Sequence, residues 1–235
     1  MPVAVMGLIT VVLGVDAGGT ISTQRLLGIL TWLALALALR RETPLVRAQV
    51  LVVVLFATAV EYTFSPLLEV YTYRFDNVPL YVPPGHGLVY LAALGVGRTA
   101  WVRRHQVRLA GVVVAVGGAW ALWGLFGTDR VDALGAFWFA CLVGFLVWGP
   151  NRGLYVGAFL VVSYLEIVGT AVGTWEWQPY DPTGLVPIGN PPSGAAGGYG
   201  WFDLAALLLA PRLLALWHAR RPSSDDRRPD PQRTT

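Results

Sequence analysis

The sequence predicts an all-α integral membrane protein with about eight transmembrane helices. Of its 235 residues, 55% are hydrophobic and 13% are charged, whereas a soluble domain usually carries about 25% charged residues. The apolar residues gather in blocks, most of which have the roughly 17–25 residues that a bilayer-spanning helix needs. These blocks cover residues 3–20, 22–39, 46–62, 84–97, 109–127, 133–149, 153–172 and 200–218.

Two of the blocks are weaker than the others. Asp16 and two glycines interrupt the end of the first block, so the sequence leaves open whether this block is a full span. The block at 84–97 is short and begins within a Pro-Pro-Gly stretch. We therefore expect its helix to start deeper in the membrane than the others.

The positions of the arginines predict the orientation, because cytoplasmic loops carry an excess of basic residues. Eight spans put the arginine-rich connections on the same side as both termini. Only Arg74 and Arg130, with Arg25 near an edge, fall on the other side. We expect a multi-pass protein of the cell membrane with cytoplasmic termini and a disordered, proline-rich tail at 219–235. The cytoplasmic set is Arg40, Arg41, Arg47, Arg98, Arg103, Arg104, Arg108, Arg152 and the arginines of the tail.

Composition also excludes several classes of protein. The net charge is +3, but no aromatic and basic surface segment is present that would bind nucleic acid. Cys141 is the only cysteine, which excludes an intrachain disulfide and a cysteine metal site. The histidines, His86, His105 and His218, are too scattered for a multi-histidine metal centre. No P-loop, dinucleotide fingerprint or nucleophile elbow occurs, so we expect neither a metal nor a cofactor.

Two long connections, residues 61–86 and 166–203, resemble each other. Each has a glutamate near a helix end, then an aromatic-x-aromatic step, then Val-Pro-aliphatic-x-x-Pro-Pro. The copies are offset by about 104–108 residues, or four helices, although chance similarity between proline-rich loops is the alternative. The offset predicts two tandem halves, 1–108 and 109–218, as parallel repeats with both connections on the outer side. The matching steps are Glu61, Tyr71–Tyr73 and Val78–Pro84, and Glu166, Trp175–Trp177 and Val186–Pro192.

The two glutamates are the first candidates for catalysis. Glu61 and Glu166 both follow apolar runs, and an acidic residue at membrane depth is costly. We expect them to face each other in a cavity between the halves. A carboxyl group in an apolar pocket can hold a proton and donate it. The alternative is that each glutamate braces a neighbouring helix or loop by hydrogen bonds.

Further candidates lie near the same connections. His86 either shuttles a proton or is a wetted interfacial residue. Asp203 begins the last block and either faces the cavity or complements the helix N-terminus. Arg74 can pair with Asp76 or Glu69, or bind an anionic group of a ligand. The aromatic residues fit an interfacial belt or a cation-stabilising wall. The predicted substrate-binding set is Glu69, Tyr71, Tyr73, Arg74, Asn77, Trp175, Trp177 and Asn190.

Around these connections the sequence resembles the integral-membrane carotenoid hydratase family, whose members hydrate the terminal double bond of acyclic carotenoids. The likeness lies in Glu166-x-x-Gly169-x-x-x-Gly173-x-Trp-x-Trp and in Tyr71-x-Tyr73 followed by Val78-Pro79-Leu80. The Pro-Pro-Gly-His and Gly-Asn-Pro-Pro-Ser-Gly segments depart from the family pattern. The resemblance implies a lipid-soluble polyene that is protonated by a buried carboxylic acid and then captured by water.

Three functions are compatible with these observations. The first is an enzyme of hydratase, cyclase or isomerase type that acts on an isoprenoid or lipid-like substrate. The second is a small-solute or proton-coupled transporter, and the third is a non-catalytic membrane partner protein. A transporter has broken helices that meet at the bilayer midplane, whereas the polar residues here cluster toward one face. The enzyme is therefore the preferred interpretation, with the bilayer and a lipophilic small molecule as its partners.

Overall fold

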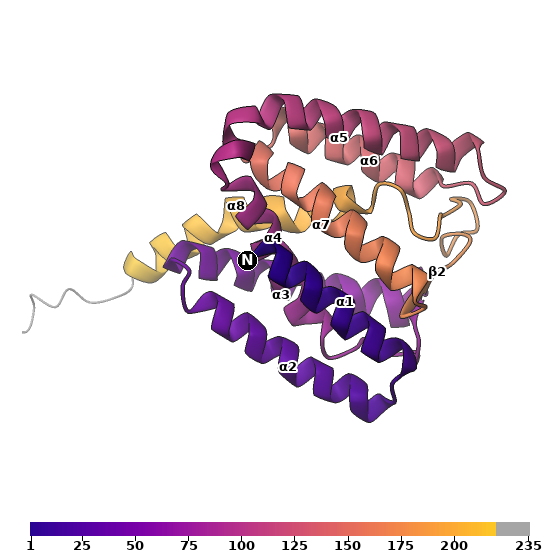
Figure 1. The fold of residues 1–235 in the computed structure, drawn as a ribbon, viewed down its shortest axis with the longest axis horizontal. Helices are drawn as coiled ribbons and strands as arrows, with labels where there is room; N and C mark the ends of the chain where they lie inside the picture. The colour runs from indigo at the N-terminus through magenta and orange to yellow at the C-terminus, as the bar shows by residue number, and fades with distance from the viewer. Residues whose placement is uncertain (220–235) are drawn as a thin grey trace, which may run out of the picture.

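The computed structural model describes residues 1–219, so the predicted disordered tail lies outside the described residues apart from Ala219. Within this range the chain forms eight α-helices close to the eight predicted blocks, which confirms the all-α class (Figure 1). A π-helical turn, η1 (Thr63–Leu67), extends the third helix, and strands β1 (Tyr71–Tyr73) and β2 (Trp175–Trp177) lie in the two long connections. The helices are α1 (Pro2–Gly18), α2 (Ile21–Leu39), α3 (Pro44–Tyr62), α4 (Val82–Gly97), α5 (Ala100–Phe126), α6 (Ala133–Trp148), α7 (Arg152–Ala171) and α8 (Ala195–Ala219).

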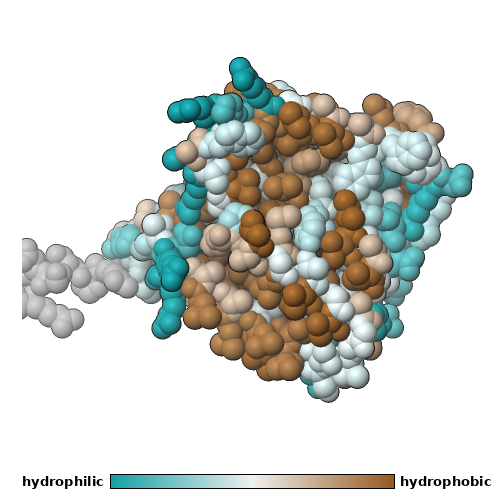
Figure 2. All heavy atoms as spheres, in the orientation of Figure 1, coloured by the Kyte–Doolittle hydropathy of each residue, from teal (hydrophilic) through white to brown (hydrophobic). Residues whose placement is uncertain are grey.

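The described surface is that of a membrane protein. Five helical segments are long and apolar enough to cross a bilayer: α2, α3 with its extension to Leu67, α5, α7 and α8. Helices α1, α4 and α6 have 17, 16 and 16 residues, fewer than the roughly 20 of a typical span. Large apolar side chains point outward, and Leu55 and Trp123 are each 62% exposed. Figure 2 shows apolar residues over the middle of one face and hydrophilic residues toward two opposite edges.

Two helices begin well before the apolar blocks that predicted them. Helix α5 starts at Ala100 because the Thr99 hydroxyl accepts a hydrogen bond from the Val102 backbone amide and caps the first turn. Arg103, Arg104 and Arg108 therefore lie in a helix, and their predicted placement in a loop is wrong. Hydropathy finds only the apolar part of a helix, and this helix has a polar first third.

Helix α8 also starts earlier than predicted, at Ala195, through a glycine-rich segment. Gly194 and Gly197 let this segment approach the α6 backbone, since a Cβ atom on Gly197 would lie 1.8 Å from the Trp138 carbonyl oxygen. Close packing thus stabilises a helix that the glycine content alone disfavours. Asp203 consequently lies inside the helix, and its predicted role at the helix N-terminus is wrong.

Four helices form the centre of the bundle. Helix α4 packs against α7 and α3 against α8, while α3 also contacts α4 and α7 contacts α8. Glycines allow the α4–α7 contact, since a Cβ atom on Gly157 would lie 2.2 Å from the Ala93 carbonyl oxygen. Helices α1 and α2 cover α4, and α5 and α6 cover α7 and α8.

The two long connections meet in a small sheet at one end of this centre. Strands β1 and β2 pair antiparallel, with Tyr71 opposite Trp177, Thr72 opposite Glu176 and Tyr73 opposite Trp175. The two aromatic-x-aromatic steps are thus direct neighbours, although about a hundred residues separate them in the sequence.

Candidate functional site

A cavity of about 300 Å³ lies beneath the two-stranded sheet. Its walls come from α1, α3, α4, α7 and α8, with Thr31 of α2 and Trp138 of α6 at its edge, and from both strands. Most lining side chains are apolar or aromatic. Both candidate glutamates, Glu61 near the end of α3 and Glu166 in the last third of α7, line this one cavity. The predicted convergence of the two carboxyl groups is therefore seen in the structure.

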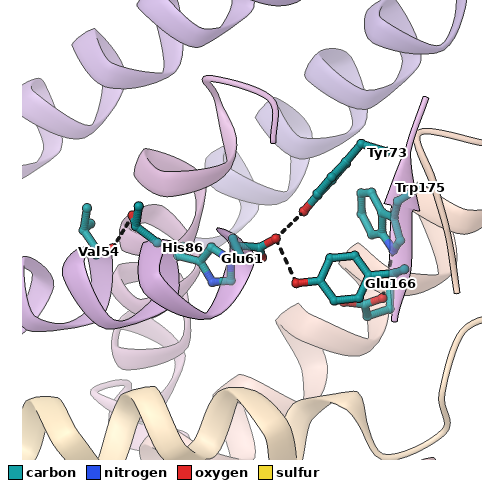
Figure 3. A network of polar contacts seen from close by, with 8 residues as sticks. Val54, Glu61, Tyr73, His86, Glu166 and Trp175 are labelled. Carbon is teal, nitrogen blue, oxygen red and sulfur yellow. Dashed lines mark hydrogen bonds and ion pairs between the residues drawn. The ribbon is translucent and has the colours of Figure 1, made fainter. Parts of the chain in front are cut away.

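Three side chains contact the carboxyl group of Glu61. Its Oε2 atom accepts hydrogen bonds from the hydroxyls of Tyr71 at 2.9 Å and Tyr73 at 2.8 Å. Its Oε1 atom lies 2.8 Å from Nε2 of His86. Figure 3 shows Glu61 between Tyr73 and His86, which come from opposite sides of the carboxyl group. Both oxygens of Glu61 are therefore engaged.

The two tyrosines reach Glu61 because successive side chains of a strand point to opposite faces. Tyr71 and Tyr73 face the cavity and are buried, whereas Thr72 between them faces away. Burial, followed by the neighbouring Glu61 carboxyl group, raises the pKa of both tyrosines well above the ordinary value. Both hydroxyls therefore keep their protons and act as donors to Glu61.

Glu166 is held differently, by two indoles. The Nε1 atoms of Trp175 and Trp177 both donate to Oε2 of Glu166 at 3.2 Å. Oε1 accepts no hydrogen bond from the residues that the structure describes. Since Glu166 is 97% buried yet lines the cavity, this second oxygen is free for a molecule in the cavity.

Two glycines of the predicted motif place these indoles. Gly169 has no side chain where the Trp175 ring passes, since a Cβ atom there would lie 1.8 Å from the ring. Gly173 adopts φ +73°, which favours glycine, in the turn that leads into β2. The spacing Glu166-x-x-Gly169-x-x-x-Gly173 thus turns the chain back so that strand β2 lies over the glutamate.

His86 lies in the second turn of α4 and is buried, not wetted at an interface as one interpretation expected. Its ring stacks on Tyr199 at 5.0 Å between centroids and meets Phe202 edge to face. Its Nδ1 atom has no hydrogen-bond partner among the described residues. With Nε2 next to Glu61, the histidine can accept or return a proton at this carboxyl group.

Other predicted residues lie outside the cavity lining. Asp203 is buried deeper in the bundle. Glu69 is exposed in the turn after η1. The side-chain amide of Asn77 donates to Gln24 at 2.8 Å, and Oδ1 of Asn190 accepts from the Trp177 backbone amide at 3.2 Å. Asn77 thus links the first long connection to α2, and Asn190 satisfies a backbone amide of β2.

Arg74 also lies outside the cavity lining. Its guanidinium donates to the carbonyl oxygens of Ala17 and Gly19, and the expected pairing with Asp76 or Glu69 is not formed. Arg130 has a similar role at the second long connection, since it donates to the carbonyl oxygens of Trp177 and Ile188. Both arginines tie a short connection between helices to a long one.

Two aspartates that the sequence analysis did not single out as functional support the site. Asp132 accepts hydrogen bonds from the backbone amides of Gly135, Gly189 and Ser193 at 2.7–2.9 Å. Asp16 accepts from the side chains of Gln24 at 3.3 Å and Tyr81 at 2.9 Å. Asp16 lies beside the connection between α1 and α2, and Asp132 lies in the connection between α5 and α6. These are the first connections of the two predicted halves, so the matching positions could have identified both aspartates from the sequence.

The described residues contain no group of three or more histidine, cysteine, aspartate or glutamate side chains that could hold a metal ion. What the arrangement offers is proton chemistry within an apolar cavity. No protein-family model matches the chain, and neither a curated protein nor a solved structure is significantly similar to it. Its function is therefore argued from the site alone.

Proposed function

We propose that the chain crosses the cell membrane eight times as two tandem halves, residues 1–108 and 109–218, with both termini in the cytoplasm. The packing supports this proposal. If the halves are equivalent, α3 corresponds to α7 and α4 to α8, so a contact between α4 and α7 should be matched by one between α8 and α3. Both contacts are present. The pairing of β1 with β2 supports it as well, since it joins equivalent segments of the two halves. The short helices α1 and α6 are then accommodated by thinning of the bilayer or by flanking polar residues that reach the interface, while α4 is covered mostly by other helices.

We further propose that the protein is a membrane-embedded enzyme that adds a proton to a lipophilic isoprenoid or polyene. The observation that carries this proposal is the convergence of Glu61 and Glu166 on one apolar cavity. A cavity of about 300 Å³ is at the lower end of the roughly 300–1,000 Å³ of small-molecule sites. It suits one end of a long molecule better than the whole of it.

The position of the cavity favours a substrate dissolved in the bilayer. Phe56 of α3 and Trp201 of α8 both line the cavity, and they are 40% and 48% exposed. These helices pack together, so the proposed entrance to the cavity lies beside their contact. An apolar chain can enter there without passing through water.

The different surroundings of the two glutamates suggest their roles. The free Oε1 atom of Glu166 donates a proton to the less substituted carbon of the terminal carbon–carbon double bond, and a tertiary carbocation results on the other carbon. Water then forms a bond from its oxygen to the cation and gives a proton to the Glu61–His86 pair. Return of that proton to Glu166 restores the starting state. The net reaction adds one water molecule across the double bond, and acid catalysis of this kind contributes about 10²–10⁴-fold.

The aromatic residues of the cavity wall are suited to stabilise the positive charge of the carbocation. Tyr71, Trp175 and Trp177 surround the space between the glutamates, and aromatic faces attract cations. If the cation instead loses a proton from another carbon, the product is an isomer of the substrate. If a second double bond captures the cation, the product is cyclic. The proposed class is therefore proton-initiated chemistry on a polyene, with hydration as the first candidate.

The test uses the full chain in lipid nanodiscs with an acyclic isoprenoid polyene in water enriched in oxygen-18. Hydration is expected to give an alcohol that carries the heavy oxygen, whereas cyclisation or isomerisation leaves the mass of the substrate unchanged. Glu166→Gln should abolish either product. The matched control is Glu176→Gln, because Glu176 lies on the same strand as the two indoles but faces away from the cavity.

The proposal fails if the polyene binds but none of these products forms, or if Glu166→Gln retains full activity. In the native host, deletion of the gene should change the isoprenoid pigments, and unchanged pigments would exclude a carotenoid substrate.

A further inference from the structure

Three buried polar groups in the centre of the bundle have no hydrogen-bond partner among the described residues. They are Oδ2 of Asp203 and the hydroxyls of Tyr90 and Tyr155, and these side chains are only 5%, 2% and 0% exposed. They come from α8, α4 and α7, and α7 packs against both of the other helices. None of the three lines the cavity of the candidate site.

The three groups interact electrostatically. Asp203 acts on both tyrosine hydroxyls and Tyr155 acts on Tyr90, where the charges of Arg98 and Glu42 act as well. Three of the six unpartnered buried side-chain atoms in the described part of the chain therefore belong to one polar cluster.

The helices place this cluster relative to the candidate site. Tyr90 follows His86 by four residues on α4, and Asp203 follows Tyr199 by four residues on α8. Since the rings of His86 and Tyr199 stack, Tyr90 and Asp203 form the next layer, about 6 Å further along the bundle. His86 contributes a fourth unpartnered atom, Nδ1, on the layer above.

Buried polar groups in proteins are paired with the protein or with ordered water, and an unpaired group is costly. The cost is greater in a membrane protein, where an ionisable residue inside a spanning helix needs a partner. A buried water molecule typically makes about three hydrogen bonds, which matches one carboxyl oxygen and two hydroxyls. A hard cation such as Ca²⁺ takes about 6–8 oxygen ligands, which is more than the three side chains offer.

We propose that Asp203, Tyr90 and Tyr155 form a binding site for ordered water inside the helix bundle, one helical turn from the His86–Glu61 pair. This site is independent of the proposed enzymatic function, because it rests on side chains that do not line the cavity. It provides a hydrated position within the bundle from which protons can exchange.

Radiolytic hydroxyl labelling of the full chain in nanodiscs tests this proposal, since a bound water molecule yields radicals that label the side chains beside it. Tyr90 and Tyr155 should gain oxygen although both are almost fully buried, and water enriched in oxygen-18 should supply that oxygen. Asp203→Leu replaces the carboxyl group with an apolar side chain of similar size and should lower the labelling of both tyrosines several-fold. Tyr155→Phe should lower the labelling of Tyr90 and serves if Asp203→Leu does not fold.

Unlabelled tyrosines in the unmodified protein would overturn the proposal, as would labelling that neither variant reduces. Because the measurement needs no substrate, its outcome is separate from that of the proposed function. Glu166→Gln should leave the labelling unchanged even where it abolishes product formation.

Discussion

The two motif connections hold their glutamates with the same backbone plan but different chemistry. In the first, two phenol hydroxyls and one imidazole nitrogen occupy both oxygens of Glu61 at 2.8–2.9 Å. In the second, two indole N–H groups bind one oxygen of Glu166 at 3.2 Å and leave the other without a partner. In both connections the hydrogen-bonding aromatic residues occupy alternate positions of a short strand.

The difference shows how two similar connections can hold a buried carboxyl group in different ways. Three short hydrogen bonds fix the carboxyl group of Glu61, whereas the two longer bonds to Glu166 orient it and leave an oxygen for chemistry. The aromatic residue at each position decides the number and strength of the donors. The predictions below test this asymmetry, beginning with the largest expected effect.

Glutamine substitutions should separate the two glutamates most clearly. Glu166→Gln should reduce product formation by about 10²–10⁴-fold with little change in the thermal unfolding midpoint, because the amide oxygen still accepts the indole bonds. Glu61→Gln should reduce activity and also lower the unfolding midpoint, because an amide nitrogen replaces one of the two carboxyl oxygens that Tyr71, Tyr73 and His86 contact. Product analysis and thermal unfolding in detergent measure both effects, and an equal loss of stability in the two variants would contradict the assigned asymmetry.

Removal of one donor on each side should sharpen the comparison. Tyr73→Phe should destabilise the protein by about 0.5–1.5 kcal/mol, the usual net contribution of an intramolecular hydrogen bond. Trp175→Phe removes a longer hydrogen bond and also reduces the volume of the ring. A double-mutant cycle separates the hydrogen-bond energy from the effect of volume. The coupling energy between Tyr73→Phe and Glu61→Gln should exceed the coupling energy between Trp175→Phe and Glu166→Gln.

A methyl group at Gly169 should disturb only the second connection. Gly169→Ala forces Trp175 away from α7 and should cost about 1–3 kcal/mol, as overpacking usually does. The matched control is Gly111→Ala in α5, where a Cβ atom meets nothing within 4 Å and helix propensity favours alanine. Thermal unfolding is again the measurement, and equal midpoints for the two variants would show that Trp175 is not tightly held.

The supporting aspartates should show the smallest effects. Asp132→Asn replaces an acceptor of backbone amides with a donor and should cost about 1 kcal/mol or more. Asp16→Asn should cost less, because its partners Gln24 and Tyr81 are side chains that can reorient. A larger effect at Asp16, measured by the unfolding midpoint, would reverse this ranking.

The sequence predicted the positions of the helices well and their ends poorly. Long apolar blocks locate helices because a bundle in lipid must be apolar outside as well as inside. The ends depend on caps and on close packing, as at Thr99 and at Gly194–Gly197, and a hydropathy pattern contains neither. The short block at 84–97 was recognised in the sequence, and its helix, α4, begins two residues earlier and has 16 residues.

The sequence also indicated the centre of the site but not its surroundings. Glu61, Glu166 and the aromatic steps stood out because polar and aromatic residues recurred at matching offsets. The pairing of β1 with β2 could not be predicted, since three-residue strands have no periodicity of their own. Arg74, Asn77 and Asn190 were expected to bind substrate. Instead they bind neighbouring polar groups of the chain, because an irregular backbone at the end of a bundle needs such partners.

The antiparallel ladder also restricts how the two connections can change length during evolution. Insertion of one residue inside β1, between Tyr71 and Tyr73, would turn one of the two phenol rings outward, because strand side chains alternate. Insertion of two residues would restore the original face. Related chains should therefore vary in steps of two residues at these places, while the stretch between Trp177 and α8 should tolerate insertions of any length at its exposed tip near Leu185, which is 81% exposed.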